Sequence, residues 1–558
     1  MYIGIDLGGT FTDGVIIAKN RVVKAIKVRT QEDISVSIEN ALQELLQGIA
    51  PEEITQVNLS TTLITNLIAQ NKLSPVGLLL IPGPGVNPHR SKFAGETKVL
   101  HGAVDYRGRI IEPLVRAEIE EACTFFQERN INRLAVACKF SQRNPALENE
   151  IVEYIQQKDP SMKLLASHEV SGLLNWIRRA NGAYYTLATR EACNVFSEKI
   201  AATLQKMHLS CPVFLLKADG GTLPLAMSLR YPLETIFSGP VASTLGALAC
   251  TEELITSVVI DLGGTTADLA LLLEGKPLLA AKGALIKQDP VPVRSLAISS
   301  LALGGDTPLF IEQGQLRFGQ RQGPAFCLGG PVLTITDVLV FLGYSDLSSP
   351  DRVKEQLEKM AASLQLTPDN FSCQVLDLFI AQIERELQKM FKAWEEEPAY
   401  RIWQVLSAHP ERPQTIICLG GPALGLGKYW REKQGREVIV PGYAAVANAI
   451  GAALARTTFE LDFFADTEQN TYTTNIGGVQ GLLRESLKST DEAREYALKL
   501  FQQTALKWQL KENAPWEILY EEGFNVVRNW QTVGRIFQVG LQTVPGIREF
   551  IKEEEDNA

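Results

Sequence analysis

The sequence IDLGGTFTD at residues 5–13 recurs, with two changes, as IDLGGTTAD at residues 260–268. In each copy an apolar run ends in an acid, the chain turns at Gly-Gly, and a second β-rich run follows a further acid. This pattern predicts a β-hairpin rather than a strand that enters a helix. The repetition predicts two similar structural units that lie far apart along the chain.

Neither hairpin carries one of the common phosphate-binding sequences. GxxxxGK[ST] and GxGxxG both need a helix amino terminus to receive the phosphate, and neither stands at these places. Glycines instead let the backbone N–H groups of each turn approach an anion closely, and threonine hydroxyls add donors. The expected phosphate-binding residues are Gly8, Gly9, Thr10 and Thr12 in the first hairpin and Gly263, Gly264, Thr265 and Thr266 in the second.

The acid that ends the first strand of each hairpin suits a magnesium ion. Asp6 and Asp261 hold these positions, and carboxylates bind Mg²⁺ directly or through its water ligands. The alternative is that each DLGGT is only a tight turn. A turn alone does not require the same two acids and the same threonine in both copies, so we predict that the hairpins clamp a phosphate chain together with Mg²⁺.

Composition and charge limit the classes of function. The 558 residues are 45% hydrophobic and 21% charged, as in globular proteins, and this length predicts roughly three to five structural units. The net charge is -10 and no dense basic run occurs, so nucleic acid is not an expected partner. No apolar stretch reaches the ~20 residues that a bilayer span needs, and the amino terminus lacks signal-peptide features. We therefore expect no membrane association and a cytoplasmic location.

Apolar periodicity outside the hairpins alternates between strand and helix, which predicts an α/β fold. The expected strands cover 57–62, 76–81 and 133–140, and the expected helices cover 34–47, 116–129, 183–207 and 375–394. Three regions follow from this pattern. We predict an amino-terminal lobe over 1–172 with an inserted subdomain around 82–113, a second lobe over 173–456, and a small α+β accessory domain over 457–558.

The order of motifs resembles the superfamily of actin, heat-shock chaperones and sugar kinases. In that superfamily two duplicated ribonuclease-H-like lobes hold ATP and Mg²⁺ in the cleft between them. The sequence is most similar to the A-type subunit of the hydantoinase/oxoprolinase branch. Besides the two hairpins, the segments that carry the resemblance are LSTTLITNLIAQNK (59–72), VFLLKADGG (213–221), FSGPVASTLGA (237–247), GPAFCLGGPVLTITDVLVFLG (323–343), LGGPALGLG (419–427) and YAAVANAIGAALA (443–455).

The resemblance implies ATP-driven opening of a cyclic amide such as hydantoin or 5-oxoproline. An amide is a poor electrophile, and phosphorylation of its oxygen creates a good leaving group. The family pattern also implies a separate B-type partner subunit. Mapped onto this chain, the pattern makes Asp6 and Asp261 ligands of Mg²⁺ through water, and it makes Gly420 and Gly421 contacts of the adenosine.

Asp219 is the third candidate catalytic carboxylate, beside Asp6 and Asp261. It follows a predicted strand and precedes Gly-Gly, so it either faces the cleft or only forms the turn. The chain also departs from the family. Where relatives carry Asp-Ile-His, the segment LAISSLALGGDTPL (296–309) has Ala297 and Ser299. Two alternatives therefore stay open: a small-molecule kinase, and an actin-like ATPase that acts on a partner protein.

Overall fold

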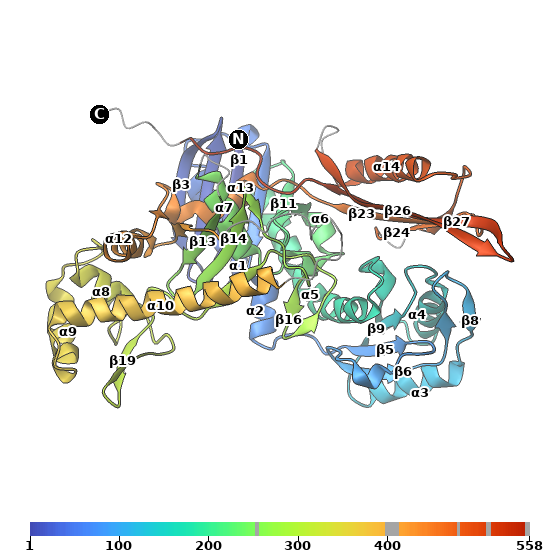
Figure 1. Cartoon of the computed structure of the whole chain (residues 1–558), viewed down its shortest axis with the longest axis horizontal. Coiled ribbons are helices and arrows are strands. Elements are labelled where there is room, and N and C mark those ends of the chain that lie inside the picture. Colours follow the sequence, from blue (N-terminus) through green and yellow to red (C-terminus); the bar gives the residue numbers. More distant parts are fainter. Residues whose placement is uncertain (252–255, 397–411, 477–479, 509–514, 553–558) are drawn as a thin grey trace.

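The computed structural model describes residues 1–251, 256–396, 412–476, 480–508 and 515–552. Two mixed sheets lie side by side at the centre of an elongated molecule (Figure 1). The first sheet has the order β12-β11-β4-β1-β2-β3, from β1 (Tyr2–Leu7), β2 (Phe11–Ala18), β3 (Arg21–Arg29), β4 (Gln56–Thr61), β11 (Val213–Leu216) and β12 (Thr222–Pro224). The second has the order β15-β14-β13-β21-β22, with β18 also paired to β14. It consists of β13 (Ser257–Leu262), β14 (Ala267–Leu273), β15 (Lys276–Pro277), β18 (Ile298–Leu301), β21 (Thr415–Leu419) and β22 (Val438–Ile439).

The two sheets share one topology. In each, a repeated hairpin opens the unit as an antiparallel pair, and its first strand runs parallel to a strand from later in the chain. The predicted duplication of α/β lobes is confirmed. The lobe boundary is different, because β11 and β12 join the first sheet, so residues 213–224 belong with the amino-terminal lobe and not with a second lobe that begins at residue 173.

Two helices of small residues lie between the sheets. In α7 (Ser238–Ala249), a Cβ added at Gly246 would stand 1.9 Å from the carbonyl oxygen of Ala447. In α13 (Ala447–Leu454), a Cβ at Gly451 would stand 1.9 Å from the carbonyl oxygen of Ala242. The two backbones are in direct contact because neither glycine has a side chain. This contact brings the two helices, and the sheets that they cover, close together at this point.

A third sheet lies beside the two lobes. Its order is β10-β9-β5-β6, all parallel, from β5 (Gly77–Ile81), β6 (Glu96–Val99), β9 (Arg133–Cys138) and β10 (Lys163–Ala166). It packs against α3 (Arg116–Gln127), α4 (Ala146–Lys158) and the long α5 (Trp176–Lys206). The insertion expected at 82–113 supplies only β6 and the hairpin of β7 (Ala103–Val104) and β8 (Ile110–Glu112), so the inserted unit is larger than the sequence indicated.

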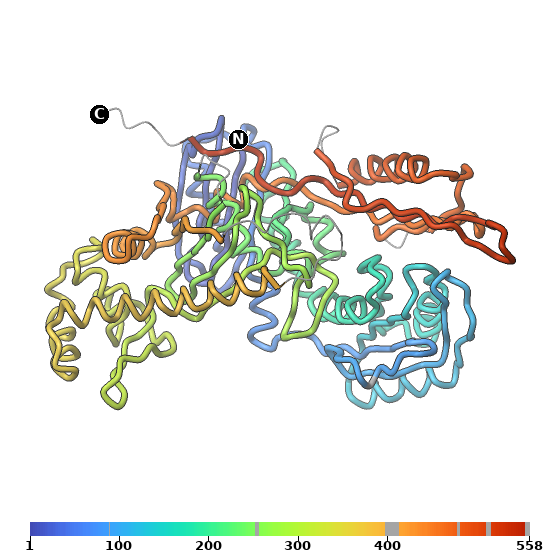
Figure 2. The backbone as a smooth tube through the Cα atoms, viewed as in Figure 1, coloured from blue at the N-terminus to red at the C-terminus, as the bar shows by residue number. Residues whose placement is uncertain are grey.

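Helices of the second lobe extend away from this inserted unit, on the far side of the two central sheets (Figure 2). They pack with the second sheet into one apolar core. These helices are α8 (Ile335–Phe341), α9 (Asp351–Ser363), α10 (Pro368–Glu395) and α12 (Ala423–Gln434), while α1 (Ile34–Leu45) and α2 (Leu63–Ala69) belong to the first lobe. No helix in the described part of the chain is long and apolar enough to cross a membrane.

The region after residue 456 is an α+β unit, as expected. Its antiparallel sheet has the order β25-β24-β23-β27-β26, from β23 (Glu460–Asp466), β24 (Thr471–Thr474), β25 (Gln480–Leu482), β26 (Trp516–Arg528) and β27 (Gln531–Thr543). The sheet and α14 (Thr490–Lys507) share an apolar core with the first lobe. A buried ion pair of 2.7 Å between Arg107 and Asp466 joins this unit to the inserted one. Ile547 and Ile551 then return to the core between the lobes.

The contact between α7 and α13 gives a first prediction. Gly451→Ala forces a methyl group onto the Ala242 carbonyl, so we expect the free energy of unfolding to fall by about 1–3 kcal/mol. Gly239→Ala, in α7 with no atom within 4 Å of the new Cβ, is the matched control and should not destabilise the protein. Chemical denaturation measures both. Equal stability of the two variants would contradict the tight contact.

Candidate functional site

The first hairpin places two carboxylates opposite each other. Asp6 on β1 is paired in register with Asp13 on β2, and both side chains are buried. Asn448 on α13 bridges them, because its Nδ2 donates to Asp6 Oδ2 at 2.8 Å and to Asp13 Oδ2 at 2.9 Å. Lys27 on β3 pairs with Asp13 at 2.7 Å. A single amide from the interlobe helix therefore fixes both acids of this hairpin.

The second hairpin repeats the arrangement with different partners. Asp261 on β13 lies in register with Asp268 on β14. The hydroxyl of Ser243, on α7, donates to Asp261 Oδ2. Beside this turn runs the Gly304-Gly305-Asp306 segment, whose backbone N–H groups at 305 and 306 donate to the carbonyls of Gly263 and Gly264 at 2.9 and 2.8 Å. The α7 and α13 helices thus each supply one polar side chain to a hairpin acid.

The acids of the two hairpins affect one another. Burial raises the pKa of Asp6 to about 7, and the charges of Asp13 and Asp261 add to this effect. Burial also raises the pKa of Asp261, with a further contribution from Asp13. The pKa of Asp268 rises to about 6 because of burial and the nearby Asp261. Residues far apart in sequence therefore form one acidic cluster where the lobes meet.

This cluster fits a hydrated divalent cation. Asp6 Oδ1 is buried and has no hydrogen-bond partner among the described residues. Buried carboxylates that raise each other's pKa favour a nearby positive charge. Within the described ranges no three acidic, histidine or cysteine side chains are close enough to ligate one metal directly. The arrangement therefore fits Mg²⁺ held through its water ligands, which is how Mg²⁺ commonly binds.

The hairpin turns leave most of the predicted phosphate-binding residues accessible, and phosphate binding there stays a prediction. Gly9, Thr10, Gly264 and Thr265 are exposed at the tips, and Gly8, Gly263 and Thr266 are half-buried behind them. Thr12 differs from the expectation. It is fully buried, and its Oγ1 hydrogen bonds to Thr30 Oγ1 at 3.0 Å. Thr30 in turn donates to the Gly8 carbonyl at 2.9 Å. Thr12 stabilises the turn from inside the lobe and offers no donor at its tip.

The predicted adenosine segment lies against the second hairpin. Gly420 has a φ of +91°, and a Cβ there would stand 2.2 Å from the Leu262 carbonyl oxygen and 2.9 Å from Asp261 Oδ1. Gly421, the next residue, is exposed, and a Cβ added to it would have no atom within 4 Å. The turn between β21 and α12 therefore reaches the acidic cluster with an open backbone, and adenosine contact there stays a prediction.

The structure does not bring Asp219 into the acidic cluster. Its Oδ1 accepts from the Gly221 N–H at 2.9 Å, and its Oδ2 accepts from Lys217 Nζ at 2.8 Å. Burial acts to raise the pKa of Asp219, but the Lys217 ammonium and the Gly221 N–H outweigh it, so the pKa is lowered. Asp219 thus forms the turn and also lines a separate cavity. Its catalytic role stays a prediction.

Sequence reasoning missed three side chains of the cluster. Asn448 is the one polar residue in the small-residue run 443–455 apart from Tyr443, and that isolation was a usable signal. Ser243 lies inside the SGPVAS motif, again in an apolar helix. Lys27 had no local signal, because a lysine on an outer strand is usually solvated. Asn448 and Ser243 contact their acids only through the tertiary fold, whereas Lys27 lies opposite Asp13 in the β2–β3 hairpin.

Family models match both lobes of the chain. The hydantoinase/oxoprolinase model matches residues 179–461, and the hydantoinase/oxoprolinase N-terminal region model matches residues 2–159. The chain belongs to the hydantoinase/oxoprolinase family. The two models together cover both hairpins, the interlobe helices and the inserted unit apart from β10.

Curated relatives within this family differ in their named activities. The chain is 24% identical to caprolactamase subunit alpha of Pseudomonas jessenii over 61% of its own length and 54% of the relative's. It therefore spans about half the length of that relative. It is 21% identical to the acetone carboxylase beta subunit of Xanthobacter autotrophicus, over 84% of this chain and 72% of that one. A 5-oxoprolinase of Pestalotiopsis fici is 26% identical over 43% of this chain and 19% of its own.

Two solved structures share the fold of this family member. The ATP-dependent caprolactamase of Pseudomonas jessenii superposes with a TM-score of 0.71 at 16% identity, over 100% of this chain and 90% of that one. Nucleotide-free acetone carboxylase superposes with a TM-score of 0.70 at 16% identity, over 99% and 88%. These likenesses confirm the mixed α/β architecture.

The buried acids of this family member predict a pH-dependent stability. The pKa of Asp6 is about 7 in the folded protein, against an ordinary 3.8. Between these values the folded protein holds a proton that the unfolded chain has lost. The stability contributed by Asp6 is therefore full below about pH 4 and is lost as the pH rises through about 7. We expect Asp6→Asn to raise the unfolding free energy of Mg²⁺-free protein at about pH 8, and to raise it by a clearly smaller amount at about pH 5, because the penalty on Asp6 grows with pH between about 4 and 7.

Chemical denaturation at the two pH values measures this difference. Asp346→Asn, a change at an exposed aspartate of the second lobe, is the control. A gain from Asp6→Asn that is the same at both pH values would contradict the buried charge at Asp6.

Proposed function

We propose that this chain is the ATP-binding subunit of an ATP-dependent hydrolase that opens a cyclic amide. The observation that supports this proposal most directly is the acidic cluster, where two repeated hairpins bring Asp6 and Asp261 together beside exposed glycine turns. Family membership and the names of the caprolactamase and 5-oxoprolinase relatives support the substrate class.

The residues of the clamp have separate tasks in this proposal. Backbone N–H groups at Gly8–Thr10 and Gly263–Thr266 bind phosphate oxygens, as turn backbones do elsewhere. Asp6 and Asp261 hold the water ligands of Mg²⁺, which supplies neutralising charge for the transferring phosphoryl group. Asn448 fixes Asp6, and Ser243 fixes Asp261, so neither acid can rotate away from the interlobe space.

The chemistry follows from the weak electrophilicity of an amide. The amide oxygen bonds to the γ-phosphorus as ADP leaves, which makes the ring carbon electrophilic. Water then adds to that carbon, the ring C–N bond breaks, and the nitrogen takes up a proton. Hydrolysis of the resulting acyl phosphate releases phosphate. Several named relatives are subunits of larger enzymes, which supports a partner subunit for this chain.

The clamp predicts that Mg·ATP binding depends on one acid from each lobe. At a concentration of 100 Kd, a ligand stabilises the folded state by about 2.7 kcal/mol. We expect wild-type protein to show this gain with Mg·ATP, and Asp6→Asn and Asp261→Asn each to lose most of it. Thermal unfolding with and without Mg·ATP measures the effect. Asp346→Asn should behave as wild type, and a full gain in both clamp variants would refute these assignments.

Substrate-dependent ATP hydrolysis tests the reaction class. Hydantoin, 5-oxoproline and ε-caprolactam are each added to the purified chain, alone and with a candidate B-type subunit. We expect one of them to raise the rate of ATP hydrolysis at least about tenfold and to be ring-opened in proportion. Phosphorylation of an added small molecule without ring opening would instead identify a kinase. Stimulation by a partner protein alone would identify an ATPase that acts on that partner.

A further inference from the structure

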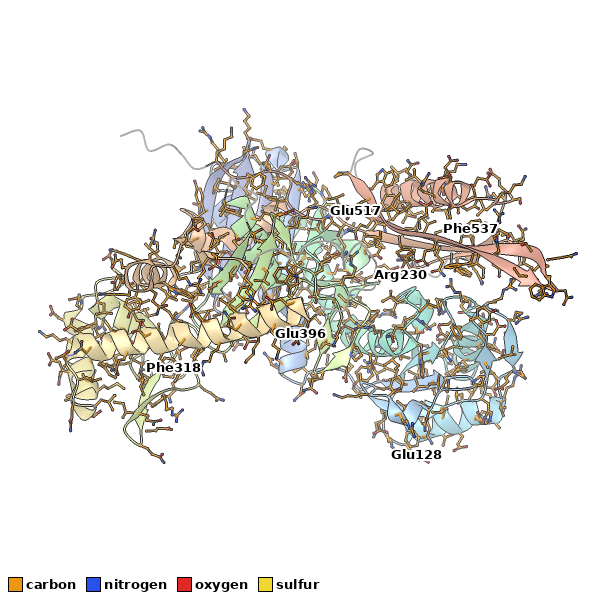
Figure 3. All side chains as sticks on the ribbon, in the orientation of Figure 1. Glu128, Arg230, Phe318, Glu396, Glu517 and Phe537 are labelled. Atoms are coloured by element: carbon orange, nitrogen blue, oxygen red, sulfur yellow. The ribbon has the colours of Figure 1, made fainter. Side chains whose placement is uncertain are left out.

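A cavity of about 140 Å³ lies where the first lobe, the segment 279–294 of the second lobe and the carboxy-terminal unit meet. Figure 3 labels Arg230, in the segment after α6 (Leu225–Ser228), and Glu517, at the start of β26, in the part of the molecule where the carboxy-terminal unit approaches the first lobe. The charged residues that line the cavity are Lys217, Asp219, Glu234, Arg294, Glu460 and Asp462. They come from four separate segments, so the cavity exists only in the complete fold.

The cavity is close to the ATP clamp along the first sheet. Strands β1, β4 and β11 are parallel and in register, so the turns after Leu7 and Leu216 emerge at the same edge. Two strand spacings separate them, which is roughly 10 Å. A hydrogen bond also ties the cavity to the first sheet, because the Thr61 N–H donates to Ser238 Oγ at 3.0 Å. Glu234, which lines the cavity, lies four residues before that serine.

The polar wall of the cavity is built around a buried ammonium group. The Lys217 side chain is only 7% exposed, and its Nζ lies 2.8 Å from Asp219 Oδ2 and 3.6 Å from Glu234 Oε2. It also donates to Thr458 Oγ1 at 3.2 Å. A buried cation with several acceptors is held in one position. An ammonium group held in this way suits the positioning of a ligand, whereas a lysine that only improves solubility is exposed.

Arg294 supplies a second set of donors. Its Nη1 pairs with Glu460 at 2.8 Å and also donates to Gln542 Oε1. The side chain is 37% exposed. A guanidinium group carries five N–H donors, so donors on Nε and Nη2 remain beyond these two contacts. Lys217 and Arg294 together suit the carbonyl or carboxylate oxygen of a ligand.

The same wall contains more acids than bases. Four carboxyl groups face two cations in the lining. Burial raises the pKa of Glu234 to about 7, although the Lys217 ammonium opposes this rise. Burial, with the charge of Glu460, raises the pKa of Asp462 to about 6, and the Tyr520 hydroxyl donates to Asp462 Oδ1 at 2.6 Å. Carboxyl oxygens in excess of the available cations suit an N–H donor on the ligand.

The lining also contains aromatic rings. The rings of Tyr231 and Trp508 stack with centroids 6.2 Å apart, and those of Phe459 and Trp508 stack at 5.6 Å. All three residues line the cavity. An engineered cavity of about 150 Å³ holds one benzene molecule, so this volume suits a single five- to seven-membered ring. Flat rings pack well against such surfaces.

We propose that this cavity is the binding site of the amide substrate, and that it takes a single small ring carrying both a carbonyl group and an N–H. The ring lies against Trp508, the oxygens face Lys217 and Arg294, and Glu234 accepts the N–H. Asp219 then acts as a positioning residue, because it fixes Lys217. This inference rests on the proposed function, since it names the site of that function's substrate.

Steady-state kinetics with the cyclic amide that stimulates ATP hydrolysis test the cavity. We expect Glu234→Gln and Trp508→Leu each to raise KM for the amide at least about tenfold, while KM for ATP and the Mg·ATP stabilisation stay unchanged. Glu522→Gln and Trp530→Leu, at exposed positions of the carboxy-terminal unit, are the matched controls. Unchanged KM for the amide in both cavity variants would overturn the assignment and leave the proposed function intact.

A direct binding measurement distinguishes failure of the cavity assignment from failure of the proposed function. If none of the three amides stimulates ATP hydrolysis, the proposed function fails. Saturation-transfer NMR with hydantoin, 5-oxoproline and ε-caprolactam then tests the cavity without turnover. Binding to the wild type that Trp508→Leu abolishes and Trp530→Leu preserves supports the cavity as a cyclic-amide site. Absence of binding to the wild type, or binding that Trp508→Leu leaves intact, overturns it. Circular dichroism confirms that the variants are folded.

Discussion

The hydrogen bonds of Asn448 to Asp6 and Asp13 tie the clamp to the helix between the lobes. An amide can reach both acids only because α13 lies directly on the first sheet, and it lies there because residue 4 of β1 is glycine. A Cβ at Gly4 would stand 2.1 Å from the Ala449 carbonyl oxygen. The same helix meets α7 through Gly451. Small residues at the interface therefore decide how close the acids of the two hairpins can come, and hence whether they act on one cation.

The same helix also connects the clamp to the cavity. Four residues after α13 ends at Leu454, the Thr458 hydroxyl accepts from Lys217. One residue earlier, Thr457 bridges to Thr222 at the edge of the first sheet. A movement of α13 that followed closure of the lobes on nucleotide would therefore be transmitted to the buried ammonium group. This continuity gives a physical reason for the carboxy-terminal unit to be packed into the core of the first lobe.

Much of this fold could be predicted from the repeat and from local periodicity. The hairpins, the small-residue helix and the α+β unit each have a pattern that reports which face is buried. The pattern does not report which sheet a strand joins, so a lobe boundary at residue 173 places β11 and β12 in the second lobe although they extend the first. The inserted unit is larger than 82–113 for the same reason. Residues 77–81 and 133–138 read as buried strands, and only the fold shows that they form a sheet of their own.

A residue of the candidate site could be predicted where the short segment around it gave a physical reason for its residue type. The acids Asp6 and Asp261 and the turn glycines meet that condition. Thr12 did not, because side chains alternate between the two faces of a strand and that of Thr12 is buried beneath the turn. Its hydroxyl hydrogen bonds there to Thr30 Oγ1. The charge of the whole chain was also a poor guide. A net charge of -10 suggests poor affinity for polyphosphate, yet the clamp concentrates still more negative charge at the site. In the proposed function, backbone N–H groups and a divalent cation would resolve this conflict, since both favour anions without a basic side chain. Nucleotide affinity in such a clamp must therefore depend on the cation far more steeply than in a site lined with lysine or arginine.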